Sequence, residues 1–108
     1  MHVAIRRYRV DPGSVAEIMR QINEGFIPII KEAEGFLAYY LLNAGAGEIA
    51  TVSVFEDQAG AEESIRMAAD WVRQNLAALL PNPPEITAGE VIAHELSLTK
   101  LGIREVRE

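Results

Sequence analysis

Hydrophobic positions along the chain follow two periods, and their order predicts the elements of a small α+β domain. Four short, largely apolar stretches have the character of strands: residues 3–10, 36–42, 48–55 and 86–94. Apolar residues from Val15 to Ala33 recur at helical spacing, and a second helical stripe runs from Ala61 to Leu79. The predicted order is therefore strand, helix, strand, strand, helix, strand.

Glycine, proline and capping residues mark where these elements end. Gly25 and Pro28 interrupt the first helical stripe, and a proline inside a helix removes one backbone hydrogen bond, so we predict a kink near Gly25. Gly35 is placed to stop that helix, and Asp57 to cap the second one. The glycine-rich segment 43–47 predicts a hairpin between the second and third strands.

Two β-α-β units in this order predict a ferredoxin-like sandwich, in which two helices cover one face of a four-stranded antiparallel sheet. We assign residues 1–95 to this domain and residues 96–108 to a C-terminal arm that packs on a partner subunit, as a short extra strand. The strands are apolar on both faces, and the helices cover only one. The uncovered face predicts a homodimer that encloses a cavity between the two sheets. The sequence leaves open which strand face lines that cavity.

Composition narrows the functional classes. The chain has 108 residues, no cysteine and a formal net charge of −6. Thiolate catalysis and cysteine-ligated metals are therefore excluded, and a negative chain is a poor partner for nucleic acid. There is no apolar run long enough for a membrane helix and no signal peptide, so we expect a cytoplasmic protein that does not bind membranes.

Residues 34–40 (EGFLAYY) and 51–57 (TVSVFED), followed by an Ala/Glu-rich helix, carry a family resemblance. Over residues 2–95 the chain resembles the antibiotic-biosynthesis-monooxygenase-like proteins of the dimeric α+β-barrel superfamily. The resemblance implies a homodimer. For the oxygenase branch it implies a monooxygenase without metal or other cofactor, in which a phenolic or quinone-type substrate reacts directly with oxygen.

Other branches of the superfamily degrade haem, isomerise substrates or respond to stress. The haem-degrading branch uses an Asn in the first strand and a Trp and a His in the second helix. This chain has Arg6 and Arg7 in that strand, and no histidine follows Trp71 in the helix. The resemblance therefore disfavours haem degradation.

Two residues are candidates for catalysis. Glu90 shares its strand parity with His94, and a carboxylate in a buried strand needs a partner such as Arg6 or Arg7. His94, at the end of the fourth strand, has the side chain best suited to act as a general base near neutral pH. Both also have a purely structural interpretation, as a paired or solvated strand residue.

The candidates for substrate binding combine aromatic rings with polar groups. Tyr39 and Tyr40 alternate, so one of them faces the helices and the other the expected cavity. The mixed polar face of the third strand is the one assigned to the cavity. Core packing is the alternative role for the aromatic members. The candidate set is Arg7, Tyr39, Tyr40, Ser53, Phe55 and Trp71.

Two functions stay open at this point. The first is a homodimeric barrel protein that binds a small aromatic or apolar ligand and acts as a cofactor-independent monooxygenase. The alternative is a non-catalytic dimeric module for binding or stress response. A cavity of about 300 Å³ with Glu90 and an arginine on its wall favours the enzyme, whereas a filled interior favours the module.

Overall fold

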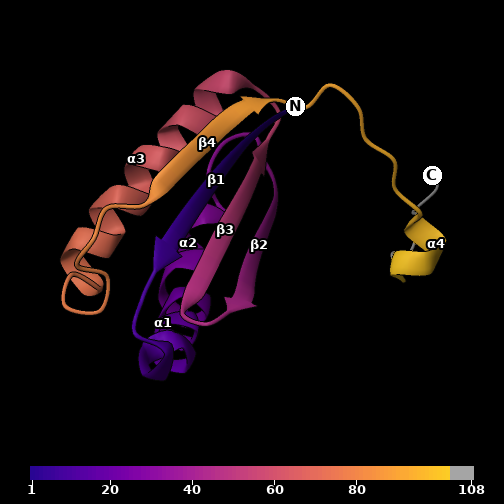
Figure 1. The fold of residues 1–108 in the computed structure, drawn as a ribbon. Helices are drawn as coiled ribbons and strands as arrows, with labels where there is room; N and C mark the ends of the chain where they lie inside the picture. Colours follow the sequence, from indigo (N-terminus) through magenta and orange to yellow (C-terminus); the bar gives the residue numbers. More distant parts are fainter. Residues whose placement is uncertain (103–108) are drawn as a thin grey trace.

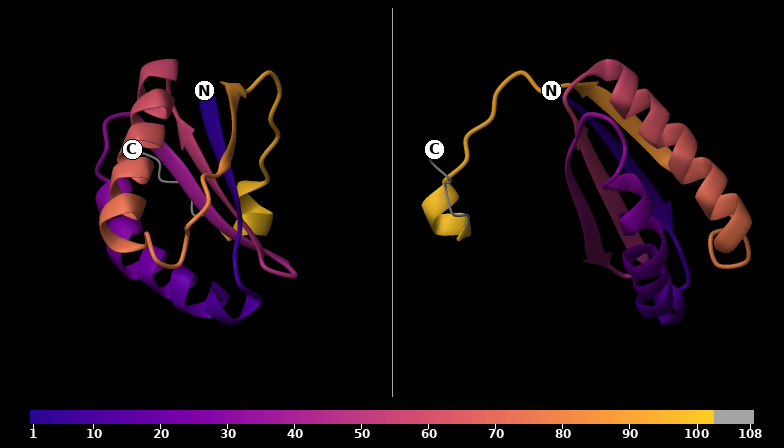
Figure 2. Two further views of the ribbon diagram at one scale, coloured as in Figure 1. Left: turned by 60° about the vertical axis from the view of Figure 1, so that its left-hand side comes forward. Right: turned by 180° about the vertical axis from the view of Figure 1, so that it is seen from behind.

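A computed structural model describes residues 1–102 of the chain. Four strands form one antiparallel sheet in the order β2-β3-β1-β4, with the long helices on one face (Figures 1 and 2). The strands are β1 (His2–Arg9), β2 (Phe36–Gly45), β3 (Glu48–Phe55) and β4 (Glu85–Glu90). The predicted ferredoxin-like α+β fold is confirmed.

The first helical segment is broken as the sequence predicts. A 3₁₀ turn (Pro12–Ser14) leads into α1 (Val15–Gln21), a π-helical stretch (Ile22–Phe26) and α2 (Ile27–Ile30). The change to π geometry ends two residues before Pro28, whose missing N–H cannot continue the regular ladder. Gly35 follows with a φ of 78°, a left-handed conformation in which it closes the segment.

Local capping also sets the second helix. The side chain of Asp57 accepts a hydrogen bond of 2.9 Å from the backbone N–H of Gly60, and α3 (Gln58–Asn75) begins there. The hairpin is tighter than predicted, because β2 continues to Gly45. Gly45, Ala46 and Gly47 take φ angles of 88°, 53° and 79°, which turn the chain directly into β3.

The core lies between the sheet and the helices, because one parity of each central strand points there. Ala4, Arg6 and Tyr8 of β1 are buried on this face, and β3 contributes residues 49, 51, 53 and 55. The least exposed large side chains are Ile18, Ile30, Ile49, Phe55 and Leu76. Tertiary structure thus decides the strand parity that the apolar pattern leaves open.

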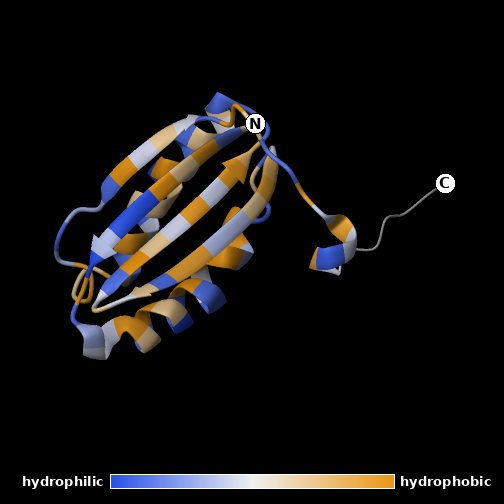
Figure 3. Cartoon of the chain, turned by 45° about the vertical axis from the view of Figure 1, so that its right-hand side comes forward, coloured by the Kyte–Doolittle hydropathy of each residue, from blue (hydrophilic) through white to orange (hydrophobic). Residues whose placement is uncertain are grey.

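No element of residues 1–102 covers the opposite face of the sheet. Figure 3 views the molecule with the sheet in front of the helices, and hydrophobic bands alternate along the strands. Tyr40 and Leu42 on this face are 56% and 44% exposed, and Val52 and Val54 are half-buried. This apolar face is the one that the sequence predicts for dimerisation.

The fourth strand is shorter than predicted. We expected residues 86–94, but β4 ends at Glu90, because its partner β1 begins at His2 and offers no further ladder. Just after β4, the Val91 N–H donates a hydrogen bond of 2.9 Å to the Met1 carbonyl. The chain then extends away from the domain (Figure 1).

The arm carries a helical turn where an extra strand was expected. Ser97 accepts a hydrogen bond of 3.2 Å from the Lys100 N–H, and α4 (Leu98–Leu101) ends at Gly102 with a φ of 76°. The cap and the left-handed glycine favour the turn over the alternating pattern at residues 96–99. Residues 103–108 of the predicted arm lie outside the described part of the chain.

Candidate functional site

A cavity lies between the sheet and the helices, within one chain. Its volume of about 20 Å³ is enough for a single water molecule. Side chains from β1, β2, β3, the π-helical stretch and α3 meet there. The lining residues are Arg6, Tyr8, Ile22, Phe26, Tyr39, Thr51, Ala68, Trp71 and Val72.

Three aromatic rings form one wall of the cavity. The ring of Phe26 packs edge-on against Tyr39 at 5.9 Å between centroids and lies 5.5 Å from the indole of Trp71. The π-helical stretch brings Gly25 against the same indole, where a Cβ would lie 2.8 Å from Cζ2. Because Gly25 has no side chain, the Trp71 indole can pack against this turn and form part of the cavity wall.

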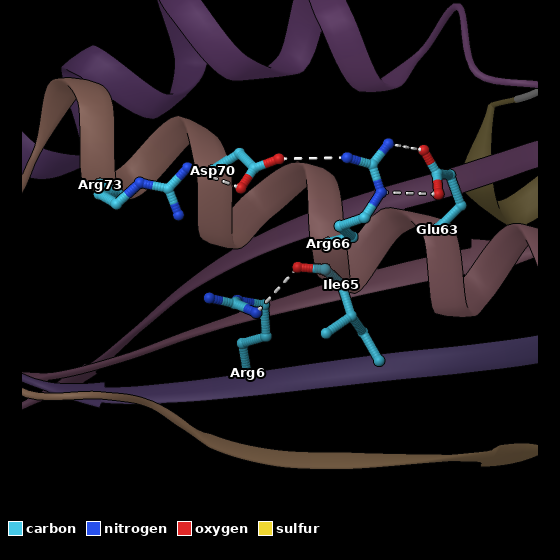
Figure 4. A network of polar contacts seen from close by, with 6 residues as sticks. All are labelled: Arg6, Glu63, Ile65, Arg66, Asp70 and Arg73. Atoms are coloured by element: carbon cyan, nitrogen blue, oxygen red, sulfur yellow. Dashed lines mark hydrogen bonds and ion pairs between the residues drawn. The ribbon is translucent and has the colours of Figure 1, made fainter.

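Arg6 and Tyr8 form the polar side of the cavity. Both are buried, at 5% exposure each, on the face of β1 that points to the helices. The Arg6 guanidinium donates to the Tyr8 hydroxyl through Nη2 at 2.7 Å and Nε at 3.0 Å. Its Nη1 donates at 3.4 Å to the carbonyl of Ile65 on α3, a contact drawn in Figure 4.

A larger groove adjoins the cavity and shares Arg6, Tyr8 and Val72 with it. Its volume is about 360 Å³, within the usual range for small-molecule sites. Its walls are the last turns of α3 and the proline-rich segment that follows. The remaining lining residues are Ala69, Arg73, Ala77, Leu80, Pro81, Asn82, Pro83 and Pro84.

Tyr39 is held in its neutral form. Burial raises the pKa of its hydroxyl to about 12, and the electrostatic interaction with Tyr8 acts in the same direction. The side chain of Thr51 and the positive charge of Arg6 act in the opposite direction on that pKa but do not outweigh burial. The Tyr39 hydroxyl is therefore suited to donate a hydrogen bond, not to accept a proton.

Comparison with known proteins identifies the family and supports the fold. The sequence profile of the antibiotic biosynthesis monooxygenase family matches residues 1–65. The chain belongs to this family. The resemblance seen in the sequence is thereby confirmed. No functionally curated protein matches the chain.

Solved structures share the fold over most of their length. The NE2512 protein of Nitrosomonas europaea, of unknown function, is 26% identical with a TM-score of 0.74, covering 89% of this chain and 93% of its own. A monooxygenase from the gene ActVA-Orf6 of Streptomyces coelicolor, in complex with nanaomycin D, is 20% identical with a TM-score of 0.71, covering 89% and 91%. Rv0793 of Mycobacterium tuberculosis is 17% identical with a TM-score of 0.67, covering 86% and 96%.

Four predicted site residues of this monooxygenase-family chain lie on the helix side of the sheet. Tyr39 and Trp71 line the cavity. Ser53 and Phe55 share the buried face of β3, at 6% and 1% exposure, but neither lines the cavity or the groove. Phe55 instead packs edge-on against Phe36 at 5.8 Å in the core.

Arg7 and Tyr40 lie on the opposite face of the sheet. Arg7 is exposed and donates a hydrogen bond of 3.3 Å to the Thr87 hydroxyl of β4. Tyr40 is one residue out of phase with the cavity tyrosine, Tyr39. Neither side chain reaches the cavity, because strand parity directs both of them to the uncovered face.

The expectation that Glu90 is a buried carboxylate paired with Arg6 or Arg7 is wrong in this structure. Glu90 is exposed and lies opposite His2 in the β1–β4 register, whereas Arg6 lies opposite Ile86. His94 lies beyond the end of β4 and is exposed as well. The fourth strand lies at the edge of the sheet and all six of its residues are exposed, so apolar neighbours in the sequence do not bury it.

The cavity lies under the helices of one chain. It is a different space from the one that the sequence predicts between the two sheets of a dimer, which stays a prediction. Sequence reasoning missed Tyr8 and Phe26, and it named Arg6 only as a partner for Glu90. The parity of Ala4, Arg6 and Tyr8 was the available signal, since it places an arginine and a tyrosine on one face of β1.

Two further findings concern the residues described, 1–102. No cluster of histidine and acidic side chains among them could hold a metal ion. None of their helices combines the length and apolar character needed to cross a membrane.

Proposed function

We propose that this family member binds a small aromatic molecule in the joined cavity and groove, and that it acts there as a cofactor-independent monooxygenase. One observation carries the proposal: an aromatic wall and a buried arginine–tyrosine pair adjoin a groove of about 360 Å³. The cavity alone is too small for a ring, so the ring occupies the groove, against Val72 and Pro83. The Streptomyces monooxygenase of the same fold was solved in complex with nanaomycin D, which supports a small-molecule ligand.

The reaction proposed is oxygenation of a phenol to a quinone. A ring carbon of the substrate takes one atom of dioxygen. The other oxygen atom leaves as water, together with the phenolic proton and the displaced ring hydrogen. The protein's part is to hold the ring away from bulk water and to place hydrogen-bond donors at its oxygen.

We further propose that the functional unit is a homodimer formed through the uncovered sheet face. Tyr40, Leu42, Val52 and Val54 make this face apolar in the single chain. The segment after β4 and the arm add exposed apolar side chains, with Ile92 at 91% exposure and Leu96 at 60%. A second copy whose arm packs across this surface would remove both sets from water.

The test combines binding with oxygen uptake. Trp71 is the only tryptophan, so its emission reports directly on the site. Phenols and hydroxyquinones should change this emission and raise oxygen consumption above the spontaneous rate. Ala69→Phe, which fills the groove, should abolish both effects, whereas Ala59→Phe, at an exposed position on the same helix, should not.

The outcomes separate the two functions left open by the sequence. Binding without oxygen uptake would favour the non-catalytic dimeric module, which is the alternative consistent with the nearly filled cavity. Absence of binding across the panel would contradict the proposal as a whole.

A further inference from the structure

The cation of Arg6 lacks a carboxylate partner among residues 1–102. The other arginines of the fold that form ion pairs are exposed. On the outer side of α3, Arg66 contacts Glu63 and Asp70, and Asp70 also contacts Arg73 at 2.9 Å (Figure 4). Arg6, on the inner side of the same helix, contacts only a hydroxyl and a backbone carbonyl.

A buried, unpaired positive charge is costly, because the protein interior replaces its hydration poorly. The chain does not lack acids, since it has 16 acidic against 10 basic residues. Yet neither the cavity nor the groove has a carboxylate in its lining. The positive charge of this site is therefore left without a negative partner in the described protein, although the protein as a whole is negative.

Arg6 also retains hydrogen-bonding capacity. A guanidinium has five N–H donors, and three of those of Arg6 are engaged, two by the Tyr8 hydroxyl and one by the Ile65 carbonyl. The Tyr8 oxygen accepts both of its bonds, so the Tyr8 proton is free to be donated elsewhere. Both side chains line the groove as well as the cavity. Hydrogen-bond donors of Arg6 and Tyr8 therefore lie together where the cavity meets the groove.

We infer that the ligand is an aromatic molecule with one anionic oxygen group, a phenolate, an enolate or a carboxylate, whose negative oxygen is bound by Arg6 and Tyr8. The inference rests on the proposed function and names the substrate class of the same site. The ring lies in the groove, and the oxygen points to the guanidinium. For a phenol, this arrangement stabilises the ionised form directly, so the site lowers the ligand's pKa without a carboxylate or histidine as base.

The test uses 4-nitrophenol, whose yellow phenolate can be followed by absorbance, and 4-nitroanisole, the same ring with the acidic proton replaced by methyl. With the full-length protein, the phenolate should bind about 10-fold or more tightly than the anisole. The anisole stands in for the neutral phenol. A 10-fold preference for the phenolate over the neutral form should lower the pKa of bound nitrophenol by about one unit. 2-Naphthoate and 2-naphthamide make the matching pair for a carboxylate.

Variants assign the effect to Arg6. Arg6→Met should abolish the preference for the anion, and Arg6→Lys should retain part of it. Arg9→Met is the matched control, since Arg9 lies on the same strand, exposed on the other face beside Glu48. Circular dichroism establishes that each variant is folded, and the wild-type comparison needs no variant.

Three outcomes would overturn the inference, and they differ in what else they affect. Equal binding of 4-nitrophenol and 4-nitroanisole would contradict the preference for an anionic ligand but would leave the proposed aromatic site intact. A preference that survives in Arg6→Met would assign the charge effect to another residue. Binding of neither ring at any pH would overturn the proposed function, and the inference with it.

Discussion

Gly25 and Trp71 are in direct contact across the helical layer, and a Cβ on Gly25 would lie only 2.8 Å from the Cζ2 atom of the indole. Ordinary carbon–carbon contacts lie near 3.5–4.0 Å, so no larger residue fits at position 25 without displacing the ring. The glycine sits in the π-helical stretch Ile22–Phe26, and Phe26 from the same stretch also packs on Trp71. One irregular turn therefore determines the shape of the cavity wall.

Gly25→Ala should destabilise the protein and move the indole. Overpacking costs about 1–3 kcal/mol, partly offset by up to about 1 kcal/mol of better helix propensity. We expect a net loss of about 1–2 kcal/mol in urea denaturation and a shift in Trp71 emission. Gly89→Ala is the control, because nothing lies within 4 Å of a Cβ there. Unchanged emission in Gly25→Ala would mean that the wall tolerates a larger residue.

Arg6 and Tyr8 should contribute to binding more than to stability. Replacing both partners of a buried polar pair with apolar groups of similar shape is often neutral or stabilising. We therefore expect Arg6→Met/Tyr8→Phe to unfold at the same urea concentration as the wild type or a higher one. Arg6→Met alone should be less stable than the double variant by about 1–3 kcal/mol, because the Tyr8 hydroxyl loses both donors. A large loss of stability in the double variant would show that the pair is structural.

Tyr39 should ionise late in an alkaline titration. Its pKa is raised from 10.0 to about 12, mainly by burial. Below the lower value the hydroxyl is neutral in both states. Between the two values only the unfolded chain ionises, so the free energy of unfolding should fall as the pH rises through this window.

Tyrosinate absorbance measures this directly. A step near pH 12 should be present in the wild type and in Tyr40→Phe, whose residue is exposed, and absent in Tyr39→Phe. The fall in stability over the same window should be smaller in Tyr39→Phe. If the absorbance step near pH 12 persists in Tyr39→Phe, the step belongs to another tyrosine.

Leu42→Lys should weaken the proposed dimer. Leu42 is 44% exposed on the uncovered sheet face, and burying an unpaired lysine in an apolar interface is costly. We expect the dimer dissociation constant to rise at least about 10-fold, equivalent to about 1.4 kcal/mol, as measured by light scattering during size exclusion. Ile29→Lys is the control, since Ile29 is 47% exposed on α2 and lies away from that face. A monomeric wild type at high concentration would contradict the dimer itself.

Local patterns along the chain were enough to predict the order of elements, the hairpin, the cap at Asp57 and the break near Gly25. These features depend on residues close together in the chain, on side-chain periodicity and on the limited conformations of glycine and proline. The fold class and the family followed from them. The ends of elements were less accurate, and β4 ended early because its length depends on β1, a partner distant in sequence.

The identity of the site residues, in contrast, depends on how the helices pack on the sheet. Both faces of the strands are apolar, so the sequence could not choose between Arg6 and Arg7, or between Tyr39 and Tyr40. The position of α3 over the Ala4–Arg6–Tyr8 face made that choice, and it is a long-range packing result. Glu90 stays exposed, because it lies at the end of the edge strand β4. Burial is a property of the assembled layers and cannot be read from neighbours along the chain.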